Sequence, residues 1–239
     1  MVVVRVDPDL RWLLPPRYRA AGARPLPADA DATVGHLVQA AGVPLTEVGA
    51  VRLGGAPVGR ATRPGLRAVL DVEPVVRPRP VPPGGFLLDV GLGTLARRLR
   101  LLGLDAAWSN DADDPSLVEQ AAAEHRVLLT QDRGLLMRRA LSHGALVRGS
   151  RPDDQLADVL DRFAPALAPL TRCAACNGPL EPAPKAEVLA QLEPGTRRTV
   201  EDFSRCTQCR RVYWRGAHAT RIDAVVRAAT ARAHGLIGG

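Results

Sequence analysis

Apolar and polar positions follow a regular pattern through the middle of the chain. Residues 86–88 form a short apolar run, and Leu95, Leu99 and Leu102 then follow at helical spacing. The same order of strand and helix is repeated further along the chain. The other expected strands are 104–108, 127–129 and 145–147, and the other expected helices are 114–124, one that reaches about residue 143, and 153–163. This alternation predicts an α/β domain, with a parallel sheet and flanking helices.

The first 76 residues have a different pattern. Residues 2–6 form an apolar strand, and Thr33 is placed to cap a helix whose apolar side chains share one face. A hairpin that turns at Gly54-Gly55 and a last strand over 68–76 follow. These elements predict a small α+β domain of the β-grasp type, in which segment 8–32 has no clear pattern.

A proline-rich stretch separates the two patterns. Residues 77–85 have the sequence RPRPVPPGG, which favours a linker over a helix or a strand. We therefore expect a β-grasp domain at 1–76, a linker at 77–85, the parallel-sheet domain at 86–168, and a cysteine-bearing region with a basic tail at 169–239.

Composition and charge narrow the class of protein. The chain has 239 residues, and 46% of them are hydrophobic, which is enough to form the cores of these domains. No apolar run approaches the roughly 20 residues of a membrane span, and no signal peptide is recognisable, so we expect a cytoplasmic protein without membrane contact. The net charge of +7 favours an anionic partner such as nucleic acid. Because 31 of the 32 basic residues are arginine, coding bias is the alternative explanation.

Aspartates follow the first three strands of the predicted sheet. Asp89 follows the first strand, Asp111, Asp113 and Asp114 follow the second, and Asp132 follows the third. Ligand sites of open parallel sheets form beyond the carboxyl ends of the strands. Clustered carboxylates favour Mg²⁺ or Mn²⁺, which can lower the pKa of a bound water and stabilise charge on a phosphate.

The alternative is that each aspartate only caps the helix after its strand. Asp114 fits that role best because it precedes Pro115. Behind Asp89, Arg97 and Arg100 lie three residues apart and are expected to share a helix face. That face is either solvated or a binding surface for phosphates.

The four cysteines form two CxxC pairs. Two such pairs present four thiolates for tetrahedral Zn²⁺, a closed shell that favours a structural metal over a catalytic one. Redox chemistry and an iron–sulfur cluster are the alternatives. The ligands are Cys173, Cys176, Cys206 and Cys209.

The C-terminal tail is rich in arginine. From Arg205 onward there are seven arginines and one acid, Asp223, with an aromatic Tyr-Trp pair among them. Basic residues with aromatics suit phosphate contacts and base stacking. Alternatively, Trp214 packs on the cysteine module, and His218 is a surface residue or a spare metal ligand. The RNA-binding candidates in this tail are Arg210, Arg211, Trp214, His218 and Arg221.

Several of these motifs together resemble one family. The segments FLLDVGLGTLARRLRLLGLDAAW, DADD and LLTQDRGLL, two CxxC pairs and YWRGAHATRI resemble the PIN-like RNase domain named after the C-terminal region of the mutator-seven exonuclease. The resemblance implies a PIN-like sheet whose acids are Asp89, Asp111 or Asp113, and Asp132 with Thr130. It also implies that residues 1–76 are a ubiquitin-like domain and that a zinc ribbon follows the sheet.

These observations lead to three functional hypotheses. The first is a metal-dependent ribonuclease in which Asp89 and Asp132 bind Mg²⁺ or Mn²⁺ and Asp113 or Asp111 completes the site. The second is a non-catalytic RNA-binding protein with a structural zinc ribbon. The third is an adaptor that binds a protein partner through the ubiquitin-like domain.

Overall fold

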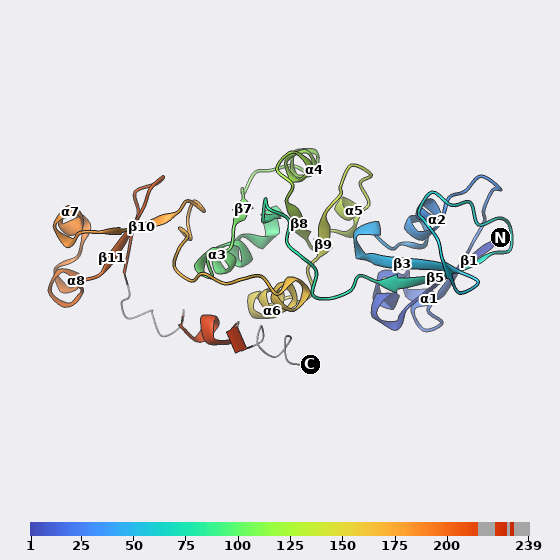
Figure 1. Ribbon diagram of the computed structural model, residues 1–239, viewed down its shortest axis with the longest axis horizontal. Coiled ribbons are helices and arrows are strands. Elements are labelled where there is room, and N and C mark those ends of the chain that lie inside the picture. Colours follow the sequence, from blue (N-terminus) through green and yellow to red (C-terminus); the bar gives the residue numbers. More distant parts are fainter. Residues whose placement is uncertain (215–222, 229, 232–239) are drawn as a thin grey trace. The chain divides into compact units, whose positions relative to one another are not determined.

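The structure is a computed structural model of the chain (Figure 1), and it describes residues 1–214, 223–228, 230 and 231. Contacts between residues divide the chain into two compact units. One unit is Met1–Arg79 with Thr130–Leu146, and the other is Pro80–Leu129 with Val147–Gly239. Among the described residues, no helix is both long enough and apolar enough to cross a membrane.

The first unit contains a five-stranded sheet with the order β2-β1-β5-β3-β4. Strands β1 and β5 are parallel, and the other pairs are antiparallel. The helix α2 (Val34–Ala41) begins after Thr33, whose side chain accepts a hydrogen bond from the His36 N–H (3.3 Å). The predicted β-grasp arrangement and its helix cap are thus confirmed. The strands are β1 (Val2–Val6), β2 (Ala23–Leu26), β3 (Val48–Leu53), β4 (Ala56–Pro57) and β5 (Val69–Pro74).

Segment 8–32, which had no clear pattern, contains three elements. These are a 3₁₀ helix η1 (Pro8–Leu13), a short helix α1 (Pro16–Arg19) and strand β2. Strand β2 lies at the edge of the sheet and pairs only with β1. Its sequence, ARPL, lacks alternation because an edge strand next to solvent tolerates arginine and proline.

The first unit also includes residues of the predicted parallel-sheet region, namely α5 (Arg133–Leu136) and β9 (Gly144–Leu146). The buried Glu47 carboxylate accepts a hydrogen bond from the Leu146 N–H (2.8 Å), and Arg133 Nη1 donates to the Leu13 carbonyl (2.6 Å). The prediction that the helix here reaches about residue 143 is wrong. It ends at Leu136, and Gln39 Nε2 donates to the Met137 carbonyl (3.1 Å), which removes an acceptor that a longer helix would use.

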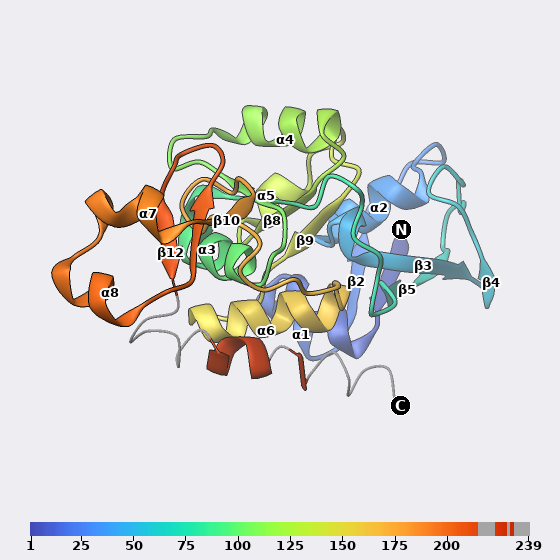
Figure 2. The same ribbon diagram turned by 60° about the vertical axis from the view of Figure 1, so that its left-hand side comes forward.

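The second unit contains the parallel strands β6 (Phe86–Leu88), β7 (Ala106–Trp108) and β8 (Val127–Thr130), with β6 between the other two. Helix α4 (Asp114–Ala123) lies on one side of these strands, and α3 (Gly93–Leu101) and α6 (Pro152–Phe163) lie on the other (Figure 2). The predicted stripe of leucines on α3 is buried, and the rings of Phe86 and Phe163 meet edge to face at 5.3 Å. The predicted α/β arrangement is therefore confirmed.

The end of the proline-rich stretch packs tightly against this unit. A Cβ atom on Gly84 would lie 2.0 Å from the Glu124 carbonyl oxygen, so a larger residue would displace backbone. The adjacent Gly85 carbonyl accepts a hydrogen bond from the Val127 N–H (2.9 Å). The two glycines therefore allow the close approach that starts strand β6.

The cysteine-bearing region forms a three-stranded antiparallel sheet of β10 (Leu180–Ala183), β11 (Phe203–Cys206) and β12 (Val212–Trp214). The short helices α7 (Lys185–Val188) and α8 (Pro194–Thr199) lie between β10 and β11. Val188 and Leu192 pack against Phe203 in a small core. Helices α7 and α8 thus form an insert between two strands of the ribbon, and β12 follows the second CxxC pair.

Candidate active site and metal centre

Asp89 follows the central strand of the parallel sheet. Its strand is in register with both neighbours, since Leu88 lies opposite Trp108 and Leu129. The Asp89 N–H donates to the Leu129 carbonyl (3.0 Å), and its half-buried carboxylate accepts from the Val90 N–H (2.6 Å). The side chain thus lies at the carboxyl end of the sheet and caps the 3₁₀ helix η3 (Val90–Leu92).

Asp111 and Asp113, which follow β7, are exposed and belong to the same unit as Asp89. Asp113 Oδ1 accepts from the Ser116 N–H (2.9 Å) and is the N-cap of α4, while Asp111 accepts a hydrogen bond from Ser109 Oγ. The hydrogen bonds from Ser116 lower the pKa of the Asp113 carboxyl. The prediction that Asp114 is the cap is wrong by one residue, because Asp114 is the first residue of the helix.

Asp132 follows β8 and belongs to the first unit. Its Oδ1 accepts from the Gly134 N–H (2.6 Å), so it caps α5. Its own N–H donates to Oγ1 of the fully buried Thr130 (2.9 Å). The Thr130 hydroxyl therefore holds the backbone of Asp132 in place, and the Asp132 carboxylate is exposed.

Three of the four candidate acids are thus helix caps, as the alternative hypothesis predicted. In each hydrogen bond given above, one carboxylate oxygen accepts from a backbone N–H, and a carboxylate has about four acceptor positions on its two oxygens. Capping is therefore compatible with cation binding. Within the described ranges, no group of three or more acidic side chains has its ligand atoms within 4.8 Å of one another.

The four cysteine side chains, in contrast to the acids, are close enough together to share one metal ion. Their Sγ atoms lie within 4.8 Å of one another, and all four are free thiols. Cys173 and Cys206 are buried, whereas Cys209 is exposed. The Cys173–Cys209 Sγ distance is 3.6 Å and the Cys176–Cys206 Sγ distance is 3.4 Å. This arrangement can hold a metal ion.

The surroundings of Cys173 favour its thiolate. Burial opposes ionisation, but the Tyr213 hydroxyl at 3.0 Å and the N–H groups of Cys176 and Ala175 hydrogen-bond to the sulfur. Together they lower the pKa of Cys173 to about 6. Tyr213 therefore contacts a ligand of the candidate metal centre instead of lying free on the surface.

Arg100 is also part of the surroundings of the cysteines. Its Nε donates to the Ala106 carbonyl (2.8 Å), and its Nη1 donates to the carbonyls of Ala174 (3.2 Å) and Ala175 (2.8 Å) inside the first CxxC pair. Burial lowers the pKa of Arg100, and the nearby thiols of Cys173 and Cys176 oppose that shift. The guanidinium stays charged, and it lies where thiolates around a divalent ion would leave net negative charge.

The expectation that Arg97 and Arg100 share an exposed face is therefore wrong. Arg97 is exposed, but Arg100 is only 3% exposed. Arg98, between them in sequence, pairs with Asp153 (2.5 Å). Of the two arginines, Arg97 alone remains a candidate for contact with RNA.

A polar network that sequence reasoning missed also joins the cysteine region to the sheet. The Asp105 carboxylate accepts from Arg126 (2.6 Å), Asn177 (2.9 Å) and Arg172 (2.9 Å). Burial alone would raise the pKa of Asp105, but the hydrogen bonds from Arg126 and Asn177 lower it. Asn177 also accepts from the Ala106 N–H (3.1 Å). No local motif indicates this network, because Asn177 is 72 residues from Asp105.

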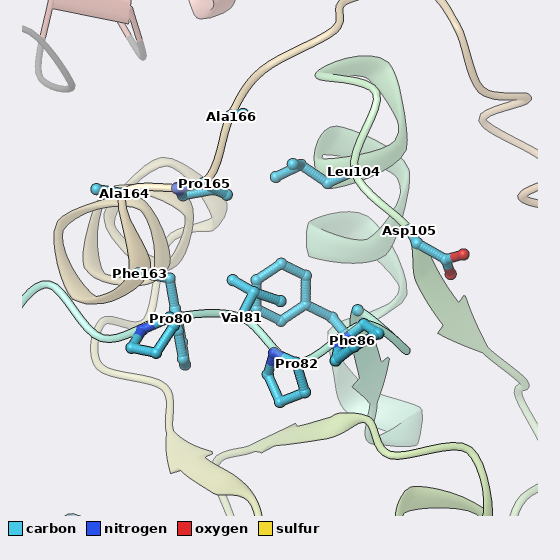
Figure 3. A pocket seen from close by; sticks show the side chains of 12 residues that line it. Pro80, Val81, Pro82, Phe86, Leu104, Asp105, Phe163, Ala164, Pro165 and Ala166 are labelled. Atoms are coloured by element: carbon cyan, nitrogen blue, oxygen red, sulfur yellow. The ribbon is translucent and has the colours of Figure 1, made fainter.

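A cavity of about 420 Å³ lies at the start of strands β6 and β7 (Figure 3), whereas Asp89 follows the end of β6. It is lined by prolines of the segment before β6, by Leu104 and by the rings of Phe86 and Phe163. Asp105 is the carboxylate in its lining, and this group is already bonded to Arg126, Asn177 and Arg172. Asp105 is the only ionisable side chain in this lining, so the cavity offers no free acid or base group for catalysis.

The described part of the basic tail is accessible. Arg210 and Arg211 are exposed, and Trp214 is 42% exposed although its ring lies 6.2 Å from that of Phe203. Both hypotheses for Trp214, packing and accessibility to RNA, are thus compatible with its position. His218 and Arg221 lie outside the described residues.

Taken together, these features define a class of protein. A β-grasp domain precedes a parallel α/β domain with acids at the carboxyl ends of its strands, and a four-cysteine ribbon is attached to that domain through Arg100 and Asp105. The family comparison agrees with this class: the Mut7-C RNAse domain matches residues 84–226 and the Mut7-C ubiquitin domain matches residues 1–79. The chain belongs to the Mut7-C RNAse domain family. No curated protein and no solved structure matches it significantly.

Proposed function

We propose that this chain is a metal-dependent ribonuclease that hydrolyses RNA phosphodiester bonds at its acidic sheet edge. The observation that carries the proposal is the position of Asp89, a half-buried carboxylate at the carboxyl end of the central parallel strand of an RNase-family domain. That is where open α/β sheets bind their ligands.

The residues at this edge have separate roles. Asp89 and Asp132 are ligands for Mg²⁺ or Mn²⁺, and Asp113 or Asp111 completes the set. Oxygen donors suit these hard cations. In each cap one carboxylate oxygen accepts a backbone N–H, and the further acceptor positions of a carboxylate are compatible with a cation. When bound, the metal supplies a bound water of lowered pKa and stabilises charge on the phosphate under attack.

The metal of the four-cysteine centre is zinc in this proposal, and its role is structural. Four thiolates fit tetrahedral Zn²⁺ and leave no open position for substrate. Tyr213 and Arg100 surround the ligands, as outer groups of zinc sites commonly do. The zinc therefore holds the ribbon together and does not take part in cleavage.

The proposal is tested with the purified full chain and end-labelled RNA. Cleavage should require added Mg²⁺ or Mn²⁺ and should stop when those ions are left out. Single-stranded and structured RNA should be compared, because their relative rates define the substrate class. Absence of cleavage with either ion, at protein concentrations that saturate the RNA, would contradict the proposal.

Arg210 and Arg211, which follow the second CxxC pair, are expected to contribute to RNA affinity and not to cleavage. Replacing Arg210 and Arg211 with alanine should weaken binding to unrelated RNA sequences and flatten its salt dependence by roughly 0.7 in slope for each phosphate that the variant no longer neutralises. Trp214→Ala should cost about 1–3 kcal/mol of binding with little change in slope if the ring stacks on a base. Fluorescence anisotropy over a salt series measures both quantities.

Arg197 and Arg198 on α8 are the matched control for the arginine pair. They are also adjacent, exposed and in the same module, so replacing both removes the same charge from another element. An unchanged affinity and salt slope in the Arg210/Arg211 variant would show that this part of the tail is a solvated surface. An equal loss in the control variant would show that the tail acts only through net charge. His218→Ala should be assayed in parallel for affinity and for cleavage at saturating RNA.

A non-catalytic RNA-binding protein is the second candidate function. The observation that favours it is the capping role of Asp89, Asp113 and Asp132, which explains those acids without a metal. The ubiquitin-like domain supports a protein partner as a further possibility for either function.

A further inference from the structure

A second cavity lies entirely within the first unit and is strongly basic. Its volume is about 380 Å³, and its wall is formed by the start of α2, the loop around residue 60 and the segment that follows α5. Three arginines and a histidine line it, and no aspartate or glutamate does. The cationic lining residues are His36, Arg60, Arg138 and Arg139.

The cationic groups are open to solvent, and two of the arginines have no acidic partner. Arg60, Arg138, Arg139 and His36 are all exposed. Neither Arg60 nor Arg139 forms an ion pair with a carboxylate in the part of the chain that the structure describes. Arg60 Nη2 donates to the Leu45 carbonyl (2.9 Å), which holds its side chain at the cavity wall. Like charges gathered around one hollow repel each other unless an anion neutralises them.

The start of α2 adds a positive field to the cavity but few free donors. The Val34 N–H donates to the Thr62 carbonyl (2.8 Å), the Gly35 N–H to the Arg60 carbonyl (2.8 Å), and the His36 N–H to the Thr33 hydroxyl. The first N–H groups of the helix are thus already bonded. The helix dipole still favours an anion there, and the hydrogen bonds to that anion must come from side chains.

Thr46 provides an independent sign of a missing ligand. It lines the same cavity and is only 9% exposed, and its Oγ1 has no hydrogen-bond partner. A buried hydroxyl without a partner is destabilising, and most such groups in folded proteins are bonded. A ligand with acceptor oxygens would satisfy Thr46 and the arginines together.

We propose that this cavity binds the terminal phosphate of a nucleotide, either free or at the end of an RNA. A terminal phosphate carries nearly two negative charges and three acceptor oxygens, which match several guanidinium groups better than a carboxylate does. A cavity of this volume is within the range of small-molecule sites and has room for more than the phosphate. The inference is independent of cleavage, because binding requires none of the candidate catalytic acids.

The test uses the full chain without added divalent cations, and the probes are AMP, adenosine, inorganic phosphate, and one RNA oligonucleotide with a 5′-phosphate or a 5′-hydroxyl. AMP should bind, adenosine should bind at least about tenfold more weakly, and inorganic phosphate should compete with AMP. Arg60→Gln and Arg139→Gln should each weaken AMP binding about tenfold or more. Arg63→Gln is the matched control, because Arg63 is three residues from Arg60, is exposed, and pairs with Asp31 (3.6 Å).

Thr46→Val separates ligand binding from a structural role. It removes the unpartnered hydroxyl while keeping the shape of the side chain, so it should raise the melting temperature of the free protein and weaken AMP binding. A purely structural Thr46 would not give these opposite effects.

The two sources of phosphate give distinct results. Tight binding of AMP indicates a free nucleotide, and a preference only for the 5′-phosphorylated oligonucleotide over its 5′-hydroxyl form indicates an RNA end; both support the proposal. If no phosphate-bearing probe binds, or if the Arg60 and Arg139 variants bind as tightly as the Arg63 control, the proposal is overturned. The ribonuclease assay is unaffected by that outcome.

Discussion

Replacing Asp89 with asparagine is expected to reduce metal-dependent cleavage of RNA by on the order of a hundredfold or more while the protein remains folded. Asparagine keeps an acceptor oxygen for the Val90 N–H and is as good an N-cap as aspartate. The substitution therefore removes the negative charge and leaves the cap. Asp132→Asn should behave in the same way, because the Gly134 N–H still finds an acceptor.

This choice of substitution separates the two roles of the acids. If Asp89 is only a cap, Asp89→Asn should change neither the cleavage rate nor the melting temperature, whereas Asp89→Ala should cost about 1 kcal/mol of stability. If it binds a cation, both variants lose cleavage, and Asp89→Ala also loses stability. Initial rates over a Mn²⁺ titration and thermal melts of the same preparations measure both effects.

Asp114→Asn is the matched control. Asp114 is the first residue of α4, next to the cap Asp113, so its loss removes a charge from the same loop without removing an expected ligand or a cap. It should retain cleavage near the parent rate. Parent-like cleavage by both Asp89→Asn and Asp132→Asn would mean that any activity arises elsewhere and that the acids are caps.

Local sequence signals predicted the parts of the fold whose contacts are local. The leucine stripe of α3 needs only helical spacing and a core to face, and Leu95, Leu99 and Leu102 are all fully buried. The cap at Thr33 and the turn at Gly54-Gly55 depend on residues within a few positions of each other. These features were therefore predictable without knowledge of the tertiary structure.

The incorrect predictions concern residues whose roles are set by distant partners. A spacing of three residues placed Arg97 and Arg100 on one face, but the acceptors of Arg100 include carbonyls more than 70 residues away. The carbonyl of Met137 is likewise bonded by Gln39, 98 residues away. Periodicity gives a residue's direction on its own helix, but it does not identify the partner it meets.

The boundary between the first two domains illustrates the same limit. In sequence the proline-rich stretch separates them clearly, and the two family matches divide there as well. In the structure, residues 130–146 of the RNase-family region pack with the ubiquitin-like domain, through Glu47, Arg133 and Gln39. A buried carboxylate such as Glu47 has no sequence signal, because its partner is a backbone N–H 99 residues away.

Replacing Cys206 with serine is expected to abolish stable zinc binding and to unfold the three-stranded ribbon. Metal analysis of the parent should find about one zinc per chain, and the variant should hold little. Apparent free energies of structural zinc binding are about 10–16 kcal/mol in small zinc modules, which exceeds what the small core around Phe203 can replace. Ser204→Ala, on the same strand and not a ligand, is the control and should keep its zinc.

The damage should extend from the ribbon to one side of the parallel sheet. Arg100 donates to the carbonyls of Ala174 and Ala175, and Asn177 accepts from the Ala106 N–H, so an unfolded CxxC pair leaves a buried guanidinium and strand β7 without these partners. Amide hydrogen exchange should therefore show reduced protection over 173–214 and at Ala106. Helix α4, whose cap Asp113 bonds the Ser116 N–H within the helix, should stay protected.

The exchange pattern decides whether the ribbon is an independent module. Reduced protection that stops at residue 173 would show that Arg100 and Asn177 do not couple the two parts, and full protection throughout would show that the cysteines hold no structural metal. Arg100→Met provides the complementary measurement, because it removes the link while leaving the ligands. It should retain zinc and lower the protection of the Ala106 amide less than Cys206→Ser does, because the Asn177 side chain still accepts from the Ala106 N–H.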